Sequence, residues 1–122
     1  MPTDGRTAKQ GWIAVLDDGR QIEVEGVVLL GRNPRGRPGE DDAQLIKIAD
    51  ATRTVSKTHL ALGADAHGMY VMDRGSTNGS TVTSAGGVCT PCPPGDIIEV
   101  QEGNIVSIGD HWLEIRRAHP TQ

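Results

Sequence analysis

The chain has 122 residues and a net charge of −4, a balance that argues against a general nucleic-acid-binding protein. Glycine and proline make up about a fifth of it, below the roughly 25–30% that marks low-complexity sequences, and its length suits one folded domain. No apolar run approaches the ~18 residues needed to cross a bilayer and the N-terminus is polar, so we expect neither direct membrane insertion nor a secretory signal.

Short strands dominate the predicted secondary structure. Residues 21–25 alternate polar and apolar side chains, which is typical of a half-buried strand, and the apolar run 27–30 fits a strand buried on both faces. Further strands are expected at 12–16, 45–48, 59–63, 69–73, 81–83, 97–100, 104–108 and 111–116. Turns that contain glycine separate them, and this spacing predicts an all-β sandwich or barrel. Its core must be aliphatic, because the chain has two Trp, one Tyr and no Phe.

One stretch allows two interpretations. Residues 40–62 contain neither Gly nor Pro, and Asp41 or Asp42 would suit the N-cap of a helix. Against a helix, apolar side chains alternate around Lys47. We therefore expect a strand at about 45–48, followed by an irregular loop.

The two ends of the chain are expected to be tails. Residues 1–9 and 118–122 lack periodic apolar character, which leaves one domain over 10–117.

Cys89 and Cys92 have the C-x-x-C spacing of redox sites and of half of a zinc site. A structural zinc needs two further ligands, and the sequence has no second C-x-x-C or H-x-x-x-H pair. Pro91, Pro93 and Pro94 favour an extended loop over the helix that a redox motif opens. We expect two reduced thiols, no metal and no cofactor.

Enzyme signatures are incomplete in this sequence. Residues 31–36 have the glycine spacing of a P-loop, but Arg37 and Pro38 stand where Lys and Ser or Thr are needed. Residues 75–79 place their serine, Ser76, one position too early for a nucleophile elbow. Because nothing assembles a nucleophile, a base and an oxyanion hole, we expect a protein that is not an enzyme.

Basic residues concentrate in one segment. Residues 31–60 hold six Lys and Arg and four acids, a local excess of +2, which leaves −6 for the rest of the chain. An acidic protein with one basic segment suits a small anionic ligand better than a polyanion.

Polar residues in this sequence fall where loops are expected. Arg32 follows the buried run 27–30, Ser56 and Lys57 precede the strand at 59–63, and residues 73–80 join two further strands. If the three loops meet at one end of a sandwich, they gather cationic, hydroxyl and amide donors. Such a set suits a phosphate group, whose oxygens accept charge-assisted hydrogen bonds.

This constellation resembles the forkhead-associated (FHA) domain, a family that recognises phosphothreonine peptides. Five motifs carry the resemblance over about residues 12–116, in order Gly31-Arg32, Ser56-Lys57-Thr58-His59, Asp73 with Ser76-Thr77-Asn78-Gly79, Gly95-Asp96 and Ile108-Gly109. It implies an FHA-like β-sandwich of about eleven strands, with the ligand loops at one end.

The resemblance also implies roles for single residues. Phosphate contacts are expected from Arg32, Ser56 and Lys57, while Thr77 lines the site and Asn78 holds the peptide backbone. Structural support is expected from four neighbours, Gly31, His59, Ser76 and Gly79. Lys57 stands where the family often has Arg, which replaces a bidentate contact with a point charge.

The other charged residues near these motifs are expected to be secondary. Arg35, Arg37 and Arg74 are interpreted as solvated or ancillary. The acids at 40–42 either form a solvated face of the loop or favour a basic residue in the bound peptide.

The sequence thus predicts a cytoplasmic, phosphothreonine-dependent interaction module, as a protein or as the cytosolic domain of a larger one. It would recruit its host protein to partners phosphorylated by Ser/Thr protein kinases. The alternative is a phospho-independent scaffolding or dimerisation domain that uses a face of the sandwich. A thiol-redox or metal protein acting through the cysteines is a third possibility.

Overall fold

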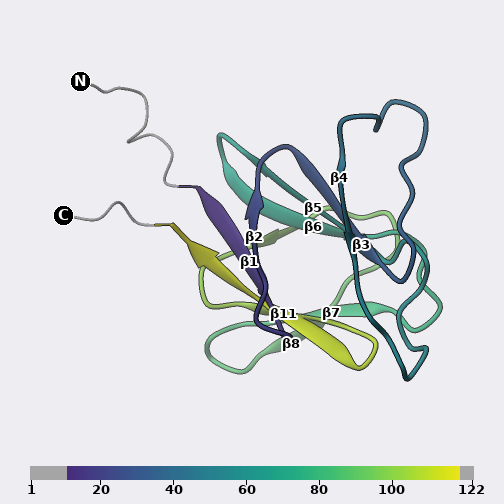
Figure 1. Ribbon diagram of the computed structural model, residues 1–122. Helices are drawn as coiled ribbons and strands as arrows, with labels where there is room; N and C mark the ends of the chain where they lie inside the picture. The colour runs from purple at the N-terminus through teal and green to yellow at the C-terminus, as the bar shows by residue number, and fades with distance from the viewer. Residues whose placement is uncertain (1–10, 119–122) are drawn as a thin grey trace.

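The computed structural model describes residues 11–118, which form eleven strands in two sheets and no helix (Figure 1). This part of the chain therefore has no helix that could cross a bilayer. The tail expected at 1–9, and all but the first residue of the tail expected at 118–122, lie outside the described residues.

The strands divide into a six-stranded and a five-stranded sheet. The first has the order β2 (Gln21–Val24), β1 (Trp12–Leu16), β11 (His111–Arg117), β10 (Ile105–Ile108), β7 (Ser80–Thr83) and β8 (Cys89–Pro91). The second has the order β4 (Gln44–Lys47), β3 (Val27–Gly31), β5 (Leu60–Asp65), β6 (Gly68–Asp73) and β9 (Ile98–Val100). Strands β3 and β4 pair in parallel, and the other neighbours pair antiparallel.

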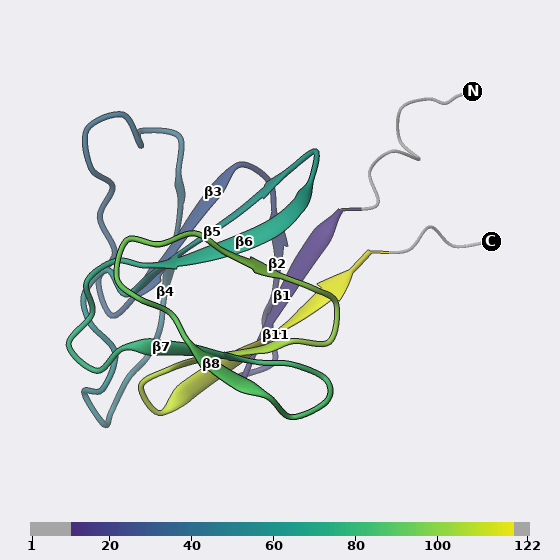
Figure 2. The ribbon, with the colours of Figure 1, turned by 180° about the vertical axis from the view of Figure 1, so that it is seen from behind.

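An aliphatic core lies between the sheets, which Figure 2 shows as two layers. Leu30 and Leu62 contribute from one sheet and Leu113 and Ile115 from the other, each at most 1% exposed. Burying such side chains removes apolar surface from water and stabilises the sandwich. The predicted all-β sandwich and its aliphatic core are confirmed.

The ambiguous stretch 40–62 contains a strand and no helix. Strand β4 begins one residue before the predicted 45–48 and lies at a sheet edge, where it pairs in parallel with β3. An irregular loop, 48–59, connects it to β5.

The proline-rich segment departs from the expected loop, because its first three residues form β8. This strand pairs only with β7 at the edge of its sheet, and Pro91 needs no ladder hydrogen bond on the open side. Both cysteines are free, and burial raises the pKa of the Cys92 thiol. Within residues 11–118, no three His, Cys, Asp or Glu side chains group to hold a metal.

Four connections gather at one end of the sandwich. The pairing of Leu30 with Leu60 and of Leu60 with Asp73 brings the β3–β4, β4–β5 and β6–β7 loops together. The pairing of Ser80 with Ile108 adds the β10–β11 turn. Figure 1 shows this loop end on the right, while β1 starts and β11 finishes on the left.

Candidate functional site

Gly31 ends β3 and brings the next residues against the β4–β5 loop. The backbone N–H of Arg32 donates to the carbonyl of Ser56, and that of Asn33 donates to the carbonyl of Lys57, both over 3.0 Å. A Cβ on Gly31 would lie 1.9 Å from the Lys57 carbonyl oxygen. Only glycine allows this close approach, so Gly31 positions the two loops.

The side chain of Arg32 is exposed and held at one atom. Its Nε donates to the Val55 carbonyl over 3.0 Å. The two terminal Nη atoms make no hydrogen bond to residues 11–118. The guanidinium is therefore oriented by the loop and keeps its outer donors for a ligand.

Ser56 joins the β4–β5 loop to the β6–β7 loop. Its Oγ accepts the backbone N–H of Thr77 over 3.0 Å, and its own backbone N–H donates to Nδ1 of His59 over 3.0 Å. Because the hydroxyl is used here as an acceptor, its hydrogen remains to be donated outward.

The other predicted contact residues lie on the same surface. Lys57 and Thr77 are exposed, and their side chains make no hydrogen bond within the described chain. Asn78 is exposed and donates from Nδ2 to the Thr54 carbonyl over 2.9 Å. The structure thus brings Arg32, Ser56, Lys57, Thr77 and Asn78 together on adjacent loops.

His59 is fully buried directly beneath these loops. Its Nδ1 accepts from Ser56, so its Nε2 carries the proton and donates to the Gly79 carbonyl over 2.9 Å. Burial lowers the pKa of His59, against the opposing influence of the Gly79 carbonyl and the Asp73 charge. The neutral ring therefore fits both partners.

Asp73 is also fully buried and organises the β6–β7 loop. Its Oδ1 accepts hydroxyl hydrogens from Ser76 over 2.6 Å and Ser80 over 2.5 Å. Its Oδ2 accepts the backbone N–H groups of Gly75 and Ser76 over 3.0 and 2.9 Å. Burial alone would raise the pKa of Asp73, but these hydrogen bonds outweigh it and hold the pKa below its usual value.

Ser76 extends the hydrogen-bond network of Asp73 to the end of the loop, because its Oγ accepts the backbone N–H of Gly79 over 2.9 Å. Gly79 has a φ of +81°, which glycine adopts without strain. Ser76 and Gly79, which were predicted to support the site structurally, thus both shape the β6–β7 loop. Sequence reasoning missed Ser80, although an Asp at a strand end followed by hydroxyl residues is a turn signal.

The β10–β11 turn supports the β4–β5 loop from the other side. The backbone N–H of Asp110 donates to Oγ1 of Thr54 over 2.7 Å. Gly109 has a φ of +62°, and a Cβ there would lie 2.5 Å from the Thr54 carbonyl oxygen. That carbonyl is the one Asn78 contacts.

His111, an ionisable residue that sequence reasoning did not assign to the site, lies beside this turn. His111 contacts Asp17 through Nδ1 at 2.9 Å and Asp50 through Nε2 at 3.3 Å. Asp50 in turn accepts the backbone N–H of Val55 over 2.8 Å. These contacts link the β1–β2 turn to the carbonyl that holds Arg32.

Arg74 is not a solvated charge, since its side chain is 4% exposed and forms two hydrogen bonds to Glu40, over 3.0 and 3.1 Å. This bidentate pair ties the β3–β4 loop to the β6–β7 loop.

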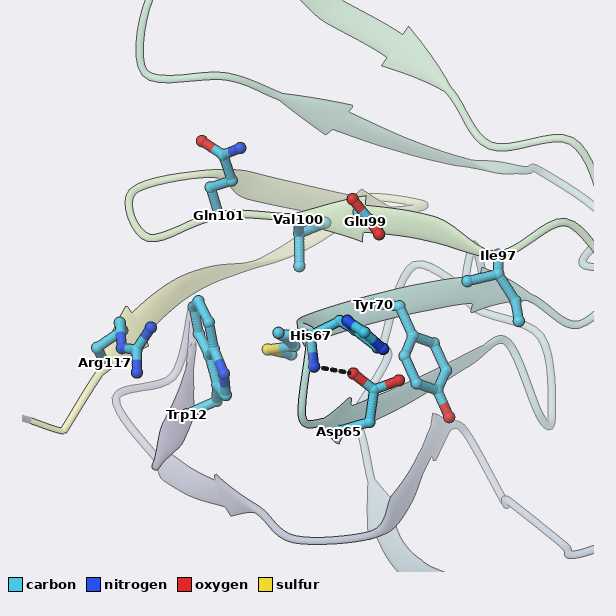
Figure 3. A pocket seen from close by; sticks show the side chains of 11 residues that line it. Trp12, Asp65, His67, Tyr70, Ile97, Glu99, Val100, Gln101 and Arg117 are labelled. Atoms are coloured by element: carbon cyan, nitrogen blue, oxygen red, sulfur yellow. Dashed lines mark hydrogen bonds between the residues drawn. The ribbon is translucent and has the colours of Figure 1, made fainter. Parts of the chain in front are cut away.

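The cavity in Figure 3 lies away from these loops. It measures about 340 Å³, and Trp12, Asp65, Tyr70 and Arg117 are among its lining residues. The Arg117 guanidinium stacks on Trp12 at 4.6 Å from the ring centroid. The cavity adjoins the β5–β6 turn, the end of that hairpin opposite Asp73, and none of the predicted site residues lines it.

The geometry of His59 predicts acid sensitivity of the domain. A proton on Nδ1 would face the Ser56 N–H donor, so the unfolded chain binds this proton more readily than the folded one. The free energy of unfolding should therefore fall as the pH drops below ~6.5. Urea unfolding from pH 7.5 to 5, with NMR titration of the imidazole nitrogens, checks this. A His59 pKa at or above ~6.5 would contradict the assignment.

Comparison with protein families identifies one matching family. The family model described as FHA domain matches residues 28–109. A comparison with curated protein sequences gave no match.

Several solved structures are similar to this chain. One, described under phosphothreonine-dependent FHA domain interactions, is 27% identical, with 91% of this chain and 99% of that chain covered and a TM-score of 0.63. The FhaA FHA domain complexed with the intracellular domain of Rv3910 is 27% identical, with coverage of 86% and 99% and a TM-score of 0.63. The FHA domain of an Arabidopsis thaliana hypothetical protein is 16% identical, with coverage of 100% and 98% and a TM-score of 0.71, a likeness of fold. With the family match spanning about two thirds of the sequence and its motif residues meeting at one end of the sandwich, this chain belongs to the FHA domain family.

Proposed function

We propose that this domain binds phosphothreonine-containing peptides and recruits its host protein to partners phosphorylated by Ser/Thr protein kinases. The observation that carries the proposal is the set of unused donors on the adjacent loops, from Arg32, Ser56 and Lys57. A similar structure at 27% identity, described under phosphothreonine-dependent FHA domain interactions, supports it.

The phosphate contacts follow from how these donors are held. The Val55 carbonyl fixes Nε of Arg32, and the Thr77 N–H fixes the Ser56 oxygen, so little ordering remains for binding. Lys57 adds a mobile point charge. A phosphate carries about −1.5 to −2 charge at pH 7 and accepts from all three groups.

The peptide backbone contacts follow from Asn78. One Nδ2 hydrogen is used on Thr54, which leaves a second N–H and the side-chain oxygen. These match a carbonyl and an N–H of an extended peptide. The adjoining Thr77 side chain would pack against the phosphothreonine methyl group.

The same geometry supports an interaction module rather than a hydrolase. Both ring nitrogens of His59 are committed, one to the Ser56 backbone N–H and one to the Gly79 carbonyl. The ring is therefore not arranged to take a proton from the Ser56 hydroxyl.

The phospho-independent scaffold has less support. The large hydrophobic residues that the structure exposes are scattered: Leu45 lies on β4 and Trp112 on β11, in different sheets, while Val88 and Ile97 lie in the loops that precede β8 and β9. They do not single out one apolar face for docking.

Removing either phosphate donor should strongly weaken phosphopeptide binding. A hydrogen bond to a charged group contributes about 1.5–3 kcal/mol, so Arg32→Ala and Ser56→Ala should each weaken binding about tenfold to over a hundredfold. Calorimetry with the best phosphopeptide from an array screen measures this.

Arg116→Ala is the matched control. Arg116 is an exposed arginine on β11, so this substitution removes the same charge far from the loops. It should bind like the wild type, and circular dichroism should show that all three variants fold. Wild-type affinity in both Arg32→Ala and Ser56→Ala would mean that the site is elsewhere.

Discrimination between phosphorylated residues separates this site from a nonspecific basic loop. Burying the extra methyl is worth only ~0.8 kcal/mol by transfer, but phosphoserine also leaves a void and a freer side chain. We therefore expect phosphothreonine to bind roughly tenfold tighter than phosphoserine. A phosphotyrosine peptide should not bind, because its ring holds the phosphate too far from the backbone that Asn78 contacts.

Titrating three otherwise identical peptides at pH 7.5 and 5.5 checks this. Affinity should fall at the lower pH as the phosphate loses its second charge near pH ~6. Equal affinity for the threonine and serine forms would remove the case for a methyl pocket.

A further inference from the structure

We propose that Asp50, held in place by His111, is a positioning residue for phosphopeptide binding. It acts through the backbone of residues 52–55 on the side chains of Arg32 and Asn78. This inference rests on the proposed function, and it assigns a role in binding to a buried carboxylate outside the five contact residues named above.

Two consecutive carbonyls of the β4–β5 loop orient two of the side chains that face the ligand. The Thr54 carbonyl accepts from Nδ2 of Asn78 over 2.9 Å, and the Val55 carbonyl accepts from Nε of Arg32 over 3.0 Å. Arg32 belongs to the β3–β4 loop and Asn78 to the β6–β7 loop. The relative position of these two side chains therefore depends on the backbone conformation at residues 54 and 55.

Asp50 fixes that conformation from inside the loop. Its side chain is fully buried, its Oδ2 accepts the backbone N–H of Val55 over 2.8 Å, and its Oδ1 accepts the Thr52 hydroxyl over 2.8 Å. Between these two partners, Arg53 has a φ of +60°. A residue with a side chain keeps this left-handed conformation only where its surroundings enforce it. The Asp50 carboxylate supplies that constraint by closing the segment 50–55.

His111 braces Asp50 against the rest of the domain. Its Nε2 lies 3.3 Å from Oδ1 of Asp50, and its Nδ1 lies 2.9 Å from Oδ2 of Asp17. The same oxygen of Asp17 accepts the backbone N–H of Trp112 over 3.3 Å. The β1–β2 turn and the start of β11 thus hold the carboxylate that shapes the β4–β5 loop.

The charge of Asp50 and its hydrogen bonds affect an anionic ligand in opposite directions. Its negative charge repels a phosphate, so loss of the charge alone would strengthen binding or leave it unchanged. Loss of the hydrogen bonds would weaken binding, because Arg32 and Asn78 would no longer be aimed. Asp50→Ala removes both the charge and the hydrogen bonds. Asp50→Asn removes the charge but keeps an acceptor for the Val55 N–H and offers a donor to His111.

Calorimetry with a singly phosphorylated threonine peptide compares these variants with the wild type. Asp50→Ala should weaken binding about tenfold, because a misdirected guanidinium loses roughly one charge-assisted hydrogen bond. Asp50→Asn should restore most of that affinity. His111→Ala should weaken binding of the wild type about threefold and add nothing to Asp50→Ala, since it acts through the same carboxylate.

A spectroscopic readout separates positioning from a general loss of stability. In the free domain, the Nε–H resonance of Arg32 reports the hydrogen bond to the Val55 carbonyl. Its exchange with water should be slow in the wild type and in Asp50→Asn, and faster in Asp50→Ala. If Asp50→Ala does not fold, His111→Ala carries the test, with the same faster exchange and its threefold loss of affinity expected.

Val24→Ala is the matched control for stability. Val24 is buried on β2 and pairs with Trp12, at the end of the sandwich opposite the loops. This substitution should lower the free energy of unfolding, measured with urea, and leave both the affinity and the Arg32 Nε–H exchange unchanged.

Wild-type affinity in Asp50→Ala, or equal weakening in Asp50→Ala and Asp50→Asn, would overturn the inference while the proposed function stands. So would weaker binding in Asp50→Ala with unchanged exchange of the Arg32 Nε–H. A wild-type domain that binds no phosphothreonine peptide would overturn both.

Discussion

The loop end of this domain depends on two buried polar side chains, His59 and Asp73, with 3.8 Å between Nε2 of His59 and Oδ1 of Asp73. His59 connects the β4–β5 loop at Ser56 to the β6–β7 loop at Gly79, and Asp73 fixes the start of the β6–β7 loop through Ser76. Buried polar groups are costly unless every hydrogen bond is made. Because these groups satisfy one another's hydrogen bonds, the β4–β5 and β6–β7 loops are held as one unit. Changing one buried group would leave the hydrogen bonds of others unsatisfied.

This arrangement separates groups that build the loops from groups that face solvent. Neutral His59 and ionised Asp73 are satisfied from within the protein, so they add no free donor to the surface. Arg32, Ser56 and Asn78 each use only part of their hydrogen-bonding capacity on the protein. The unused part faces outward from an already ordered loop. Binding would then cost little reorganisation, which is how a shallow site on a small domain can hold a charged ligand tightly enough to function.

Most strands and the loops of the candidate site could be predicted from the sequence, because both depend on local sequence patterns. Alternation of apolar residues identified most strands, and the ordered motifs indicated which loops would meet. What was missed depends on contacts between distant segments. Ser80 reaches Asp73 because β6 and β7 lie in different sheets that close over the core, and Arg74 meets Glu40 across 34 positions of the chain. Strand β8 was missed because its proline is tolerated only at an edge, and edge position follows from the assembled sheet.

The most direct test of the central claim is a crystal structure of the domain with a singly phosphorylated threonine peptide. The account predicts a phosphate contacted by the Nη atoms of Arg32 and the hydroxyl of Ser56, with the peptide backbone against Asn78. His59 and Asp73 should keep the partners they have in the free domain. A phosphate bound elsewhere, for example beside Arg117 at the opposite end of the sandwich, would contradict it. So would a complex in which the β4–β5 and β6–β7 loops rearrange to form the site.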